Sequence, residues 1–427
     1  MRRTMSRSEL MYVGEIRTRA VTVCAVRGGV DPDLLDQALS AVLADHLSLR
    51  SRIEREGDKA FLSLLEPDEI PRLSVRPQSP EVQLTEYNTP LELGGPLVRA
   101  VLLTGSDEDT LVLSVDHAVC DGRSATTLIY RLWQYYADIQ DGKRPEPDLS
   151  QQWPPSIDDL LPAHTDAELD AHVRSRLERA EGAPVAALPY LAALTGARVP
   201  AQGAMTSRRL RLTEPETAGL LAFAKSAKVS VHGLVGAALL AVVRAGLADE
   251  FADHRLACVS TIDLRDRVEQ TLSRDAMVPA AAWYQDLLEV PAGADLVDLG
   301  ARLAGNLRTA VQRGDGALEL QSLDRLAAHP DLWAASLVMT NVGAMAGPPS
   351  PAGLEIVDMT KFALSSKWNP DWGKGALLAS SMTIYGRFSI ELPYSAECFT
   401  AQQLDSVHDQ VKSLLLEFAD RAPALVG

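Results

Sequence analysis

The segment Val115-Asp116-His117-Ala118-Val119-Cys120-Asp121-Gly122 decides the fold class and the candidate chemistry of this 427-residue chain. It closes the apolar run 110–117, which reads Thr-Leu-Val-Leu-Ser-Val-Asp-His and is typical of a β-strand. A helical pattern of apolar residues follows over 125–139. The segment therefore predicts a connection from a strand to a helix, and such connections commonly border clefts.

His117 leaves this strand four residues before Asp121 and five before Gly122. A histidine here can present one ring nitrogen to a substrate, while the nearby carboxylate holds the turn and the glycine relieves backbone strain. The same residues also fit a histidine satisfied by backbone groups, followed by an Asp-Gly turn that begins a helix. Both interpretations stay open on the local sequence.

The length of the chain exceeds the size at which one hydrophobic core usually stops growing, so two lobes are expected. The stretch 141–162 is rich in proline, glycine and acidic residues, as expected of a surface linker. We therefore expect an N-terminal lobe over 1–160, a linker region over 161–205 with a charged helix near 166–181, and a C-terminal lobe over 206–427.

Periodic patterns predict helices packed on sheets in both halves, which is a mixed α/β (α+β) class. A helix is expected over 31–47, with Asp31 as its N-cap, and a nearly all-apolar buried helix over 231–243. A helix from 214 and an amphipathic final helix over 401–419 complete the helical predictions. Strands are expected at 207–212, 256–262, 336–341, 354–359, 377–385 and 387–392.

Composition excludes several function classes. Hydrophobic residues make up 46% and charged residues 23% of the chain, and the net charge of −16 argues against a nucleic-acid partner or an anionic membrane surface. The four cysteines are scattered without a CxxC pair, so neither a structural zinc site nor a disulfide framework is expected. We find no secretory signal and no membrane span, and we expect a cytoplasmic protein.

Residues 116–122 resemble the His-His-x-x-x-Asp-Gly motif of the chloramphenicol-acetyltransferase-like superfamily, which includes condensation domains and polyketide-associated (Pap-type) acyltransferases. Asp116 stands where the motif has its first histidine, while His117, Asp121 and Gly122 match the rest. Further stretches are similar to the family in the family's order: 38–53, 229–239, 260–265, 340–343 and, weakly, 371–375.

The resemblance implies two chloramphenicol-acetyltransferase-like lobes that form a pseudo-dimer with a tunnel between them. It implies that His117 is a general base, which takes a proton from an acceptor hydroxyl or amine as the acceptor attacks a thioester carbonyl. The donor would be an acyl thioester on the phosphopantetheine of an acyl or peptidyl carrier protein or of coenzyme A, with no bound cofactor. The acceptor would be a secondary metabolite or lipid, and we expect a monomer.

The resemblance also assigns roles to other residues. Asp121 would form a salt bridge with Arg265 and, with Gly122, have a structural role at the active site. Weaker candidates for substrate binding or oxyanion stabilisation are Asn341, Asp116, Trp372 and Lys374.

Other chemistry fits these residues less well. Cys120 lies three residues after His117, but alignment within one turn is difficult and no separate orienting carboxylate is evident for a Cys-His hydrolase. The sequence has no nucleophile elbow, no nucleotide-binding glycine loop and no zinc motif, and no metal is expected. A noncatalytic carrier-protein docking module, or a cyclase or lyase on the same fold, remain the alternatives.

Overall fold

The structure is a computed structural model that describes residues 1–14, 17–147, 152–186, 205–268, 270, 272–366, 376–396 and 398–422. Its contacts divide the chain into two compact units. Unit 1 comprises Met1–Leu161, Asp263–Ala281 and Ala346–Lys367, and unit 2 comprises Pro162–Ile262, Ala282–Met345 and Trp368–Gly427. Each unit is therefore built from separate stretches of the chain.

These units differ from the continuous lobes expected from the sequence. Two later segments, Asp263–Ala281 and Ala346–Lys367, belong to unit 1 because their backbone and side chains bond to its strands and helices. Helix α6 (Asp166–Ala180) lies in unit 2 and accounts for most of the described part of the expected linker region. Hydrophobic periodicity is local, so it does not reveal a segment that returns to an earlier sheet.

Unit 1 contains a five-stranded sheet with the order β12-β2-β7-β6-β5. Its long strands pair antiparallel, and only β5 runs parallel to β6. Every residue of β7 is buried, as expected of a strand covered on both faces. The strands are β2 (Thr18–Arg27), β5 (Ser74–Pro77), β6 (Val98–Thr104), β7 (Asp109–Asp116) and β12 (Glu355–Ser365).

Two long helices of unit 1 pack against each other, α2 and α4. Asp31 caps α2, because its side chain accepts hydrogen bonds from the backbone N–H groups of Asp33 and Leu34. The predicted N-cap is therefore confirmed. The helices of this unit are α1 (Arg7–Leu10), α2 (Pro32–Asp45), α3 (Pro80–Asn88), α4 (Gly122–Gln140) and α5 (Ile157–Leu160), with a 3-10 turn η1 (Leu47–Arg50).

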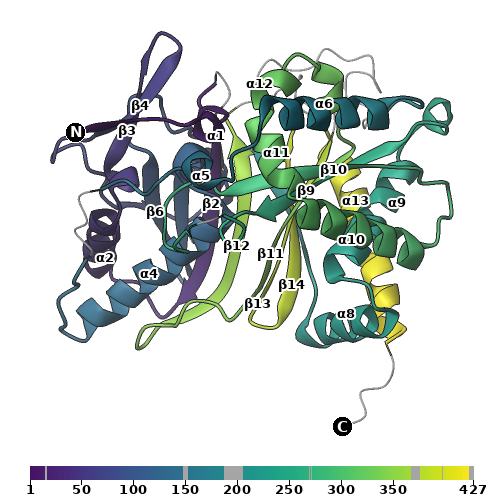
Figure 1. The fold of residues 1–427 in the computed structure, drawn as a ribbon. Helices are drawn as coiled ribbons and strands as arrows, with labels where there is room; N and C mark the ends of the chain where they lie inside the picture. Colours follow the sequence, from purple (N-terminus) through teal and green to yellow (C-terminus); the bar gives the residue numbers. More distant parts are fainter. Residues whose placement is uncertain are drawn as a thin grey trace. The chain divides into compact units, whose positions relative to one another are not determined.

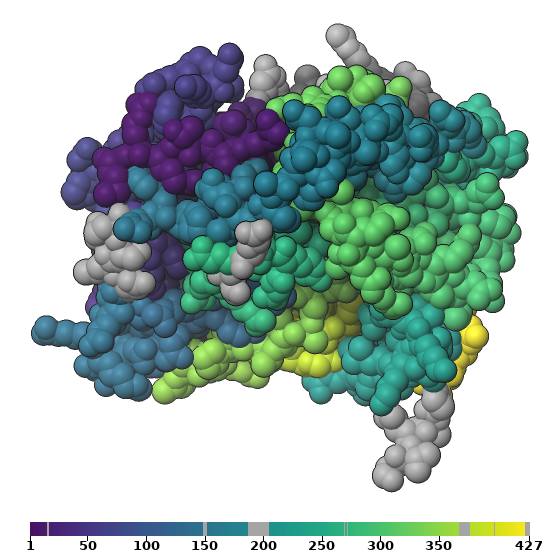
Figure 2. Space-filling model, viewed as in Figure 1, coloured from purple at the N-terminus to yellow at the C-terminus, as the bar shows by residue number. Residues whose placement is uncertain are grey.

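A second, three-stranded sheet of unit 1 has the order β1-β4-β3. It consists of β1 (Arg2–Thr4), β3 (Ser51–Glu56) and β4 (Lys59–Leu64), and its turn contains Gly57 at φ 60°. This backbone conformation favours glycine. Figure 2 shows the hairpin at the surface of this unit beside the first residues of the chain.

Unit 2 is built on a six-stranded sheet with the order β10-β9-β11-β13-β14-β8. Strand β11 pairs parallel to both β9 and β13, whereas β14 pairs antiparallel to β13 and β8. The strands are β8 (Met205–Arg211), β9 (Leu256–Asp263), β10 (Ala281–Leu288), β11 (Leu337–Met345), β13 (Leu377–Ile384) and β14 (Arg387–Ser395).

Helices of this unit pack on the sheet and on one another (Figure 1). Besides α6 they are α8 (Glu214–Ala227), α9 (Val231–Ala245), α10 (Leu296–Arg313), α11 (Asp315–Gln321), α12 (Leu323–Leu326) and α13 (Ala401–Asp420), with 3-10 turns η3 (Asp249–Phe251) and η4 (Pro330–Trp333). The mixed α/β class predicted from the sequence is confirmed.

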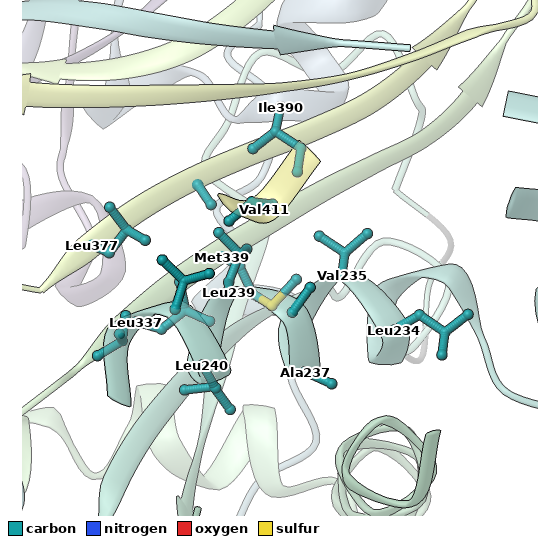
Figure 3. Close-up of a cluster of buried hydrophobic side chains, with 14 of the residues drawn as sticks. Leu234, Val235, Ala237, Leu239, Leu240, Leu337, Met339, Leu377, Ile390 and Val411 are labelled. Carbon is teal, nitrogen blue, oxygen red and sulfur yellow. The ribbon is translucent and has the colours of Figure 1, made fainter. Parts of the chain in front are cut away.

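The core of unit 2 surrounds α9, which carries apolar residues on all sides. Figure 3 shows Leu239 and Leu240 of this helix among Leu337 and Met339 of β11 and Ile390 of β14. Gly233 of α9 and Gly300 of α10 let the two helices approach so closely that a Cβ on Gly233 would lie 2.3 Å from the Gly300 carbonyl oxygen. The buried helix predicted over 231–243 is therefore central to this unit.

Within the described residues, no single helix is both long and apolar enough to cross a bilayer. Helices α8 and α9 reach the necessary length and composition only when they are taken together, and the chain bends by 102° between them.

Candidate active site

His117 lies in a 3-10 turn, η2 (His117–Val119), between the end of β7 and the start of α4. Asp116 caps this turn, because its Oδ1 accepts a hydrogen bond of 3.0 Å from the backbone N–H of Ala118. The predicted connection from strand to helix is confirmed, with a short 3-10 turn inserted. The backbone of His117 is thus held by the residue immediately before it.

The imidazole of His117 stacks on the ring of Tyr12, with centroids 4.4 Å apart and an interplanar angle of 15°. Its Nδ1 is buried and has no hydrogen-bond partner on another residue that the structure describes. Burial lowers the pKa of His117, and the negative charge of Asp121 and a contact with the histidine's own backbone oppose this only in part. The imidazole is therefore neutral at neutral pH, which is the form that can accept a proton.

Asp121 fixes the start of α4. Its Oδ1 accepts hydrogen bonds of 2.9 Å from the backbone N–H groups of both Arg123 and Ser124, and the Ser124 hydroxyl accepts one from the Asp121 backbone N–H. This is a capping box, and it stabilises the helix N-terminus that follows the turn. The turn that carries His117 is consequently held at both ends.

The second oxygen of Asp121 also accepts two hydrogen bonds. Oδ2 lies 2.5 Å from Nη1 of Arg265 and accepts a hydrogen bond of 2.8 Å from the backbone N–H of Ala280. Burial alone would raise the pKa of Asp121, but the charge of Arg265 and these hydrogen bonds outweigh burial and hold the pKa below its ordinary value. Asp121 is thus an ionised structural group without a free lone pair for proton transfer.

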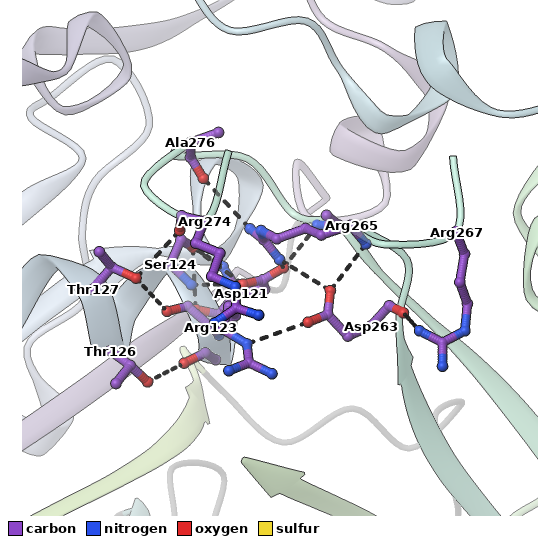
Figure 4. Close-up of polar contacts among 12 residues, drawn as sticks. Asp121, Arg123, Ser124, Thr126, Thr127, Asp263, Arg265, Arg267, Arg274 and Ala276 are labelled. Carbon is purple, nitrogen blue, oxygen red and sulfur yellow. Dashed lines mark hydrogen bonds and ion pairs between the residues drawn. The ribbon is translucent and has the colours of Figure 1, made fainter. Parts of the chain in front are cut away.

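Arg265 follows β9 and is only 1% exposed. Besides Asp121, its guanidinium donates to the carbonyl oxygen of Val278 at 3.1 Å, and its Nη1 lies 3.5 Å from Asp263 (Figure 4). Asp263 in turn pairs with Arg123 of α4 at 3.3 Å. The ion pair between Asp121 and Arg265 that the resemblance implies is present in the structure.

Gly122 does not have the role that the local sequence suggested. It is the first residue of α4 and is absent from the glycines with positive φ among the described residues, so it relieves no backbone strain. Its carbonyl oxygen instead accepts a hydrogen bond of 2.6 Å from the ammonium of Lys361, which also donates to the Thr126 hydroxyl. Strand β12 is thereby tied to the first turn of α4.

Lys361 is 5% exposed, and burial lowers its pKa to about 7. An ordinary lysine is fully charged at neutral pH, so this group is poised between two protonation states there. It lies beside the histidine-bearing turn through its contact with Gly122.

Cys120 is inert. Its side chain is completely buried, its thiol donates to the Asp121 carbonyl oxygen at 3.3 Å, and burial raises its pKa to about 12. The thiolate required of a nucleophile is therefore absent at neutral pH. This environment argues against the Cys-His hydrolase alternative.

Asp116, the residue in place of the motif's first histidine, is 1% exposed and pairs with Arg17. Burial raises the pKa of Asp116, and the positive charge of Arg17 opposes that effect. Its side chain contacts Arg17 and Ala118, whereas the His117 ring contacts Tyr12. Asp116 therefore supports the backbone of the turn that carries His117.

Asn341 lies in unit 2, at a bulge in β11. It is exposed, and its Oδ1 accepts a hydrogen bond of 2.9 Å from the backbone N–H of Gly343, whose φ is 89°. This is a side-chain-to-backbone turn of the kind that asparagine commonly forms. Trp372 and Lys374 lie outside the described residues.

Three residues of this region were not identified from the sequence: Tyr12, Arg17 and Lys361. Each reaches the 116–122 segment from a distant part of the chain, and no short motif contains them. The available signal was weak: Lys361 directly precedes the apolar run Phe362-Ala363-Leu364. No cluster of three or more metal-ligating side chains occurs in the part of the chain that the structure describes.

Comparison with known proteins supports the resemblance. The family model for the condensation domain matches residues 19–245, and the model for the C-terminus of phthiocerol/phthiodiolone dimycocerosyl transferase matches residues 201–393. A phthiocerol/phthiodiolone dimycocerosyl transferase from Mycobacterium leprae is 26% identical over 326 residues, which are 73% of this chain and 74% of that protein. A linear gramicidin synthase from Brevibacillus parabrevis is 29% identical over 138 residues, covering 29% of this chain and 3% of that protein.

Solved structures show the same fold. Polyketide synthase associated protein 5 from Mycobacterium tuberculosis aligns with a TM-score of 0.73 and 21% identity, covering 99% of this chain and 98% of that one. A trichothecene 15-O-acetyltransferase from Fusarium sporotrichioides has a TM-score of 0.73 and 12% identity, covering 98% and 95%. The epimerization domain from tyrocidine synthetase B has a TM-score of 0.72 and 19% identity, covering 99% and 97%.

Proposed function

The chain belongs to the condensation-domain family and is an acyltransferase, and on this premise we propose that His117 is its general base. The enzyme moves an acyl group from a thioester to an acceptor. The names of its relatives, phthiocerol/phthiodiolone dimycocerosyl transferase, support a lipid or secondary-metabolite acceptor. The acceptor group that we propose is a hydroxyl or an amine.

The observation that carries this proposal is the state of the His117 ring. It is neutral, its buried Nδ1 has no partner on another described residue, Asp116 caps the turn that contains it, and Asp121 caps the helix that follows. A neutral imidazole in a fixed turn meets the first requirement of a general base. Neither neighbouring carboxylate can replace it, because Asp116 is paired with Arg17 and Asp121 with Arg265.

The proposed reaction balances in protons and electron pairs. His117 takes the proton from the acceptor O–H or N–H while the acceptor atom attacks the thioester carbonyl carbon. The tetrahedral intermediate then collapses, the C–S bond breaks, and the proton passes from the imidazolium to the departing sulfur. General acid–base catalysis of this kind contributes roughly 10²–10⁴-fold to the rate. The remainder must come from substrate positioning and oxyanion stabilisation, for which Asn341, Trp372 and Lys374 stay candidates.

The donor is an acyl thioester, and we propose that it is carried on phosphopantetheine, either of a carrier protein or of coenzyme A. Relatives among the peptide synthetases support a carrier protein. The tunnel between the two lobes and the monomeric state remain predictions.

The test is product analysis with purified protein. Acylated carrier protein, acyl-coenzyme A and a panel of alcohols and amines are incubated with the enzyme, and the masses of carrier and acceptor are followed. The account predicts that the acceptor gains the mass of the acyl group while free thiol appears. A carrier that binds and stays acylated would support the docking module instead. An acceptor or donor that changes mass without acyl exchange would support a cyclase or lyase.

A further inference from the structure

Two buried arginines lie at the start of strand β2 in unit 1: Arg17 directly precedes the strand and Arg19 is its second residue. Arg17 and Arg19 are 8% and 4% exposed, and Arg19 is the register partner of Asp116 on β7. Both side chains line the same hollow as Asp116. Asp116 pairs with Arg17, while Arg19 donates to the backbone carbonyl oxygens of Glu86 and Tyr87.

Three N–H groups of these arginines are left without a partner. Nε and Nη1 of Arg17 and Nε of Arg19 are buried and have no hydrogen-bond acceptor within the described ranges. Buried polar groups in native proteins are normally satisfied, and an unsatisfied donor is costly. Such donors indicate an acceptor that the described residues do not supply, such as a water molecule or a bound ion.

The charges in this region are also unbalanced. The guanidinium groups of Arg17, Arg19 and Arg99 face two buried carboxylates. Asp116 pairs with Arg17, and Glu86 pairs with Arg99 and with the half-exposed Arg76. Among the described residues, positive charges therefore outnumber negative ones in a largely desolvated environment. Burial lowers the pKa of Arg19, but only to about 10, so the guanidinium remains charged at neutral pH. A buried charge without a counterion is unfavourable, and a bound anion would offset it.

A hollow opens at these groups. It is lined by Arg17, Arg19 and Asp116 together with Pro90, Leu91 and Ser366, and it contains about 170 Å³ of space free of protein atoms, part of it open to solvent. The enclosed part of the hollow is small, about 10 Å³, so it admits only a group of a few atoms. Pro90 and Leu91 form its apolar wall, against which the alkyl part of a small organic ion can lie.

We propose that this hollow is a binding site for a small carboxylate anion, which accepts hydrogen bonds from the free N–H groups of Arg17 and Arg19. The anion supplies the missing negative charge, and its alkyl group lies against Leu91. His117 is not among the lining residues, so the site is separate from the proposed general base. Asp116 contacts both the hollow and the turn that carries His117, so an occupied site would also hold that turn.

Acetate is the probe. Binding is measured by calorimetry and by the rise in melting temperature, with acetate, chloride and phosphate compared at constant ionic strength and neutral pH. We expect saturable binding of one acetate per chain, with a dissociation constant on the order of millimolar, and at least about tenfold weaker binding of chloride and phosphate. An acetate response no larger than that of chloride would overturn the proposal.

Two variants and a control separate the site from general ionic effects. Leu91→Phe fills the hollow and leaves both arginines in the chain, and it should weaken acetate binding by about tenfold or more. Asp116→Asn removes one of the two negative charges, and it should tighten acetate binding about tenfold, because the net positive charge increases. Arg72→Gln, at an exposed arginine, should leave the affinity unchanged. The proposal is wrong if Leu91→Phe binds acetate as the wild type does, or if Asp116→Asn binds it no more tightly.

Discussion

Asp121 Oδ2 lies 2.5 Å from Arg265 Nη1, and this buried ion pair joins two residues that are 144 positions apart. The same carboxylate caps α4 through its other oxygen. One side chain therefore fixes the helix after the His117 turn and the segment after β9, both within unit 1. Its role is to hold the geometry of the turn.

Breaking this pair should destabilise the protein strongly. Asp121→Asn or Arg265→Gln leaves the partner charge buried and uncompensated, which typically costs about 3–5 kcal/mol. We expect a large fall in melting temperature, measured by circular dichroism at neutral pH. Asp36→Asn is the matched control, because its partner Arg72 is 74% exposed and exposed pairs contribute about 0–1 kcal/mol.

The lowered pKa of Asp121 determines how its contribution to the free energy of unfolding changes with pH. A carboxyl whose pKa is depressed in the folded state stabilises the protein above its unfolded pKa of about 3.9, and the effect is lost as pH falls through the folded value. The difference in stability between wild type and Asp121→Asn should therefore be constant near neutral pH and narrow only below about pH 3.9. A difference that already narrows around neutral pH would contradict this assignment.

The stacking of Tyr12 on His117 should be visible in the pH profile of activity. Burial lowers the pKa of His117, so Tyr12→Leu, which removes the stacked ring, should let that pKa rise toward its ordinary value of about 6.5. The acidic limb of kcat/KM should then move to higher pH. Tyr12→Phe keeps the ring and serves as the control. Identical profiles for Tyr12→Leu and Tyr12→Phe would show that the ring does not set the pKa of His117.

The lowered pKa of Lys361 predicts that the free energy of unfolding rises as the pH increases above neutral. Its folded pKa is about 7, whereas an unfolded lysine titrates at about 10.4. Between these values the unfolded state binds one more proton, so this group makes stability rise with pH. Lys361→Met should remove that rise, while Lys59→Met, at an exposed lysine, should retain it. Denaturant midpoints measured from neutral to mildly alkaline pH provide the test, and parallel curves for Lys361→Met and wild type would refute it.

Elements with a strong local pattern were predicted closely from the sequence. Helix α9 was expected over 231–243 and spans Val231–Ala245, and α2 was expected over 31–47 and spans Pro32–Asp45. Their caps and apolar periodicity lie within the helix itself. Strand β2 and helix α10 were not predicted. The alternation of β2 is obscured because buried and half-buried residues mix along it.

The residues of the candidate site were likewise predicted only where a local pattern contains them. His117, Asp121 and Arg265 were identified because they belong to short segments that resemble family motifs. Tyr12 and Lys361 contact the His117 region only after β12 and the N-terminal turn have docked on unit 1, and such contacts leave no local pattern. Asp116 was noticed as a departure from the motif, but its partner Arg17 could not be named without the register of β2 and β7.

The central claim is that His117 is the general base, and the most direct measurement is the rate of thiol release from an acyl thioester in the presence of acceptor. The account predicts that His117→Gln lowers this rate by roughly 10²–10⁴-fold while the melting temperature stays near that of the wild type. His408→Gln, a change at a histidine on α13, should keep the full rate. A folded His117→Gln enzyme that releases thiol and acylates the acceptor at the wild-type rate would contradict the account.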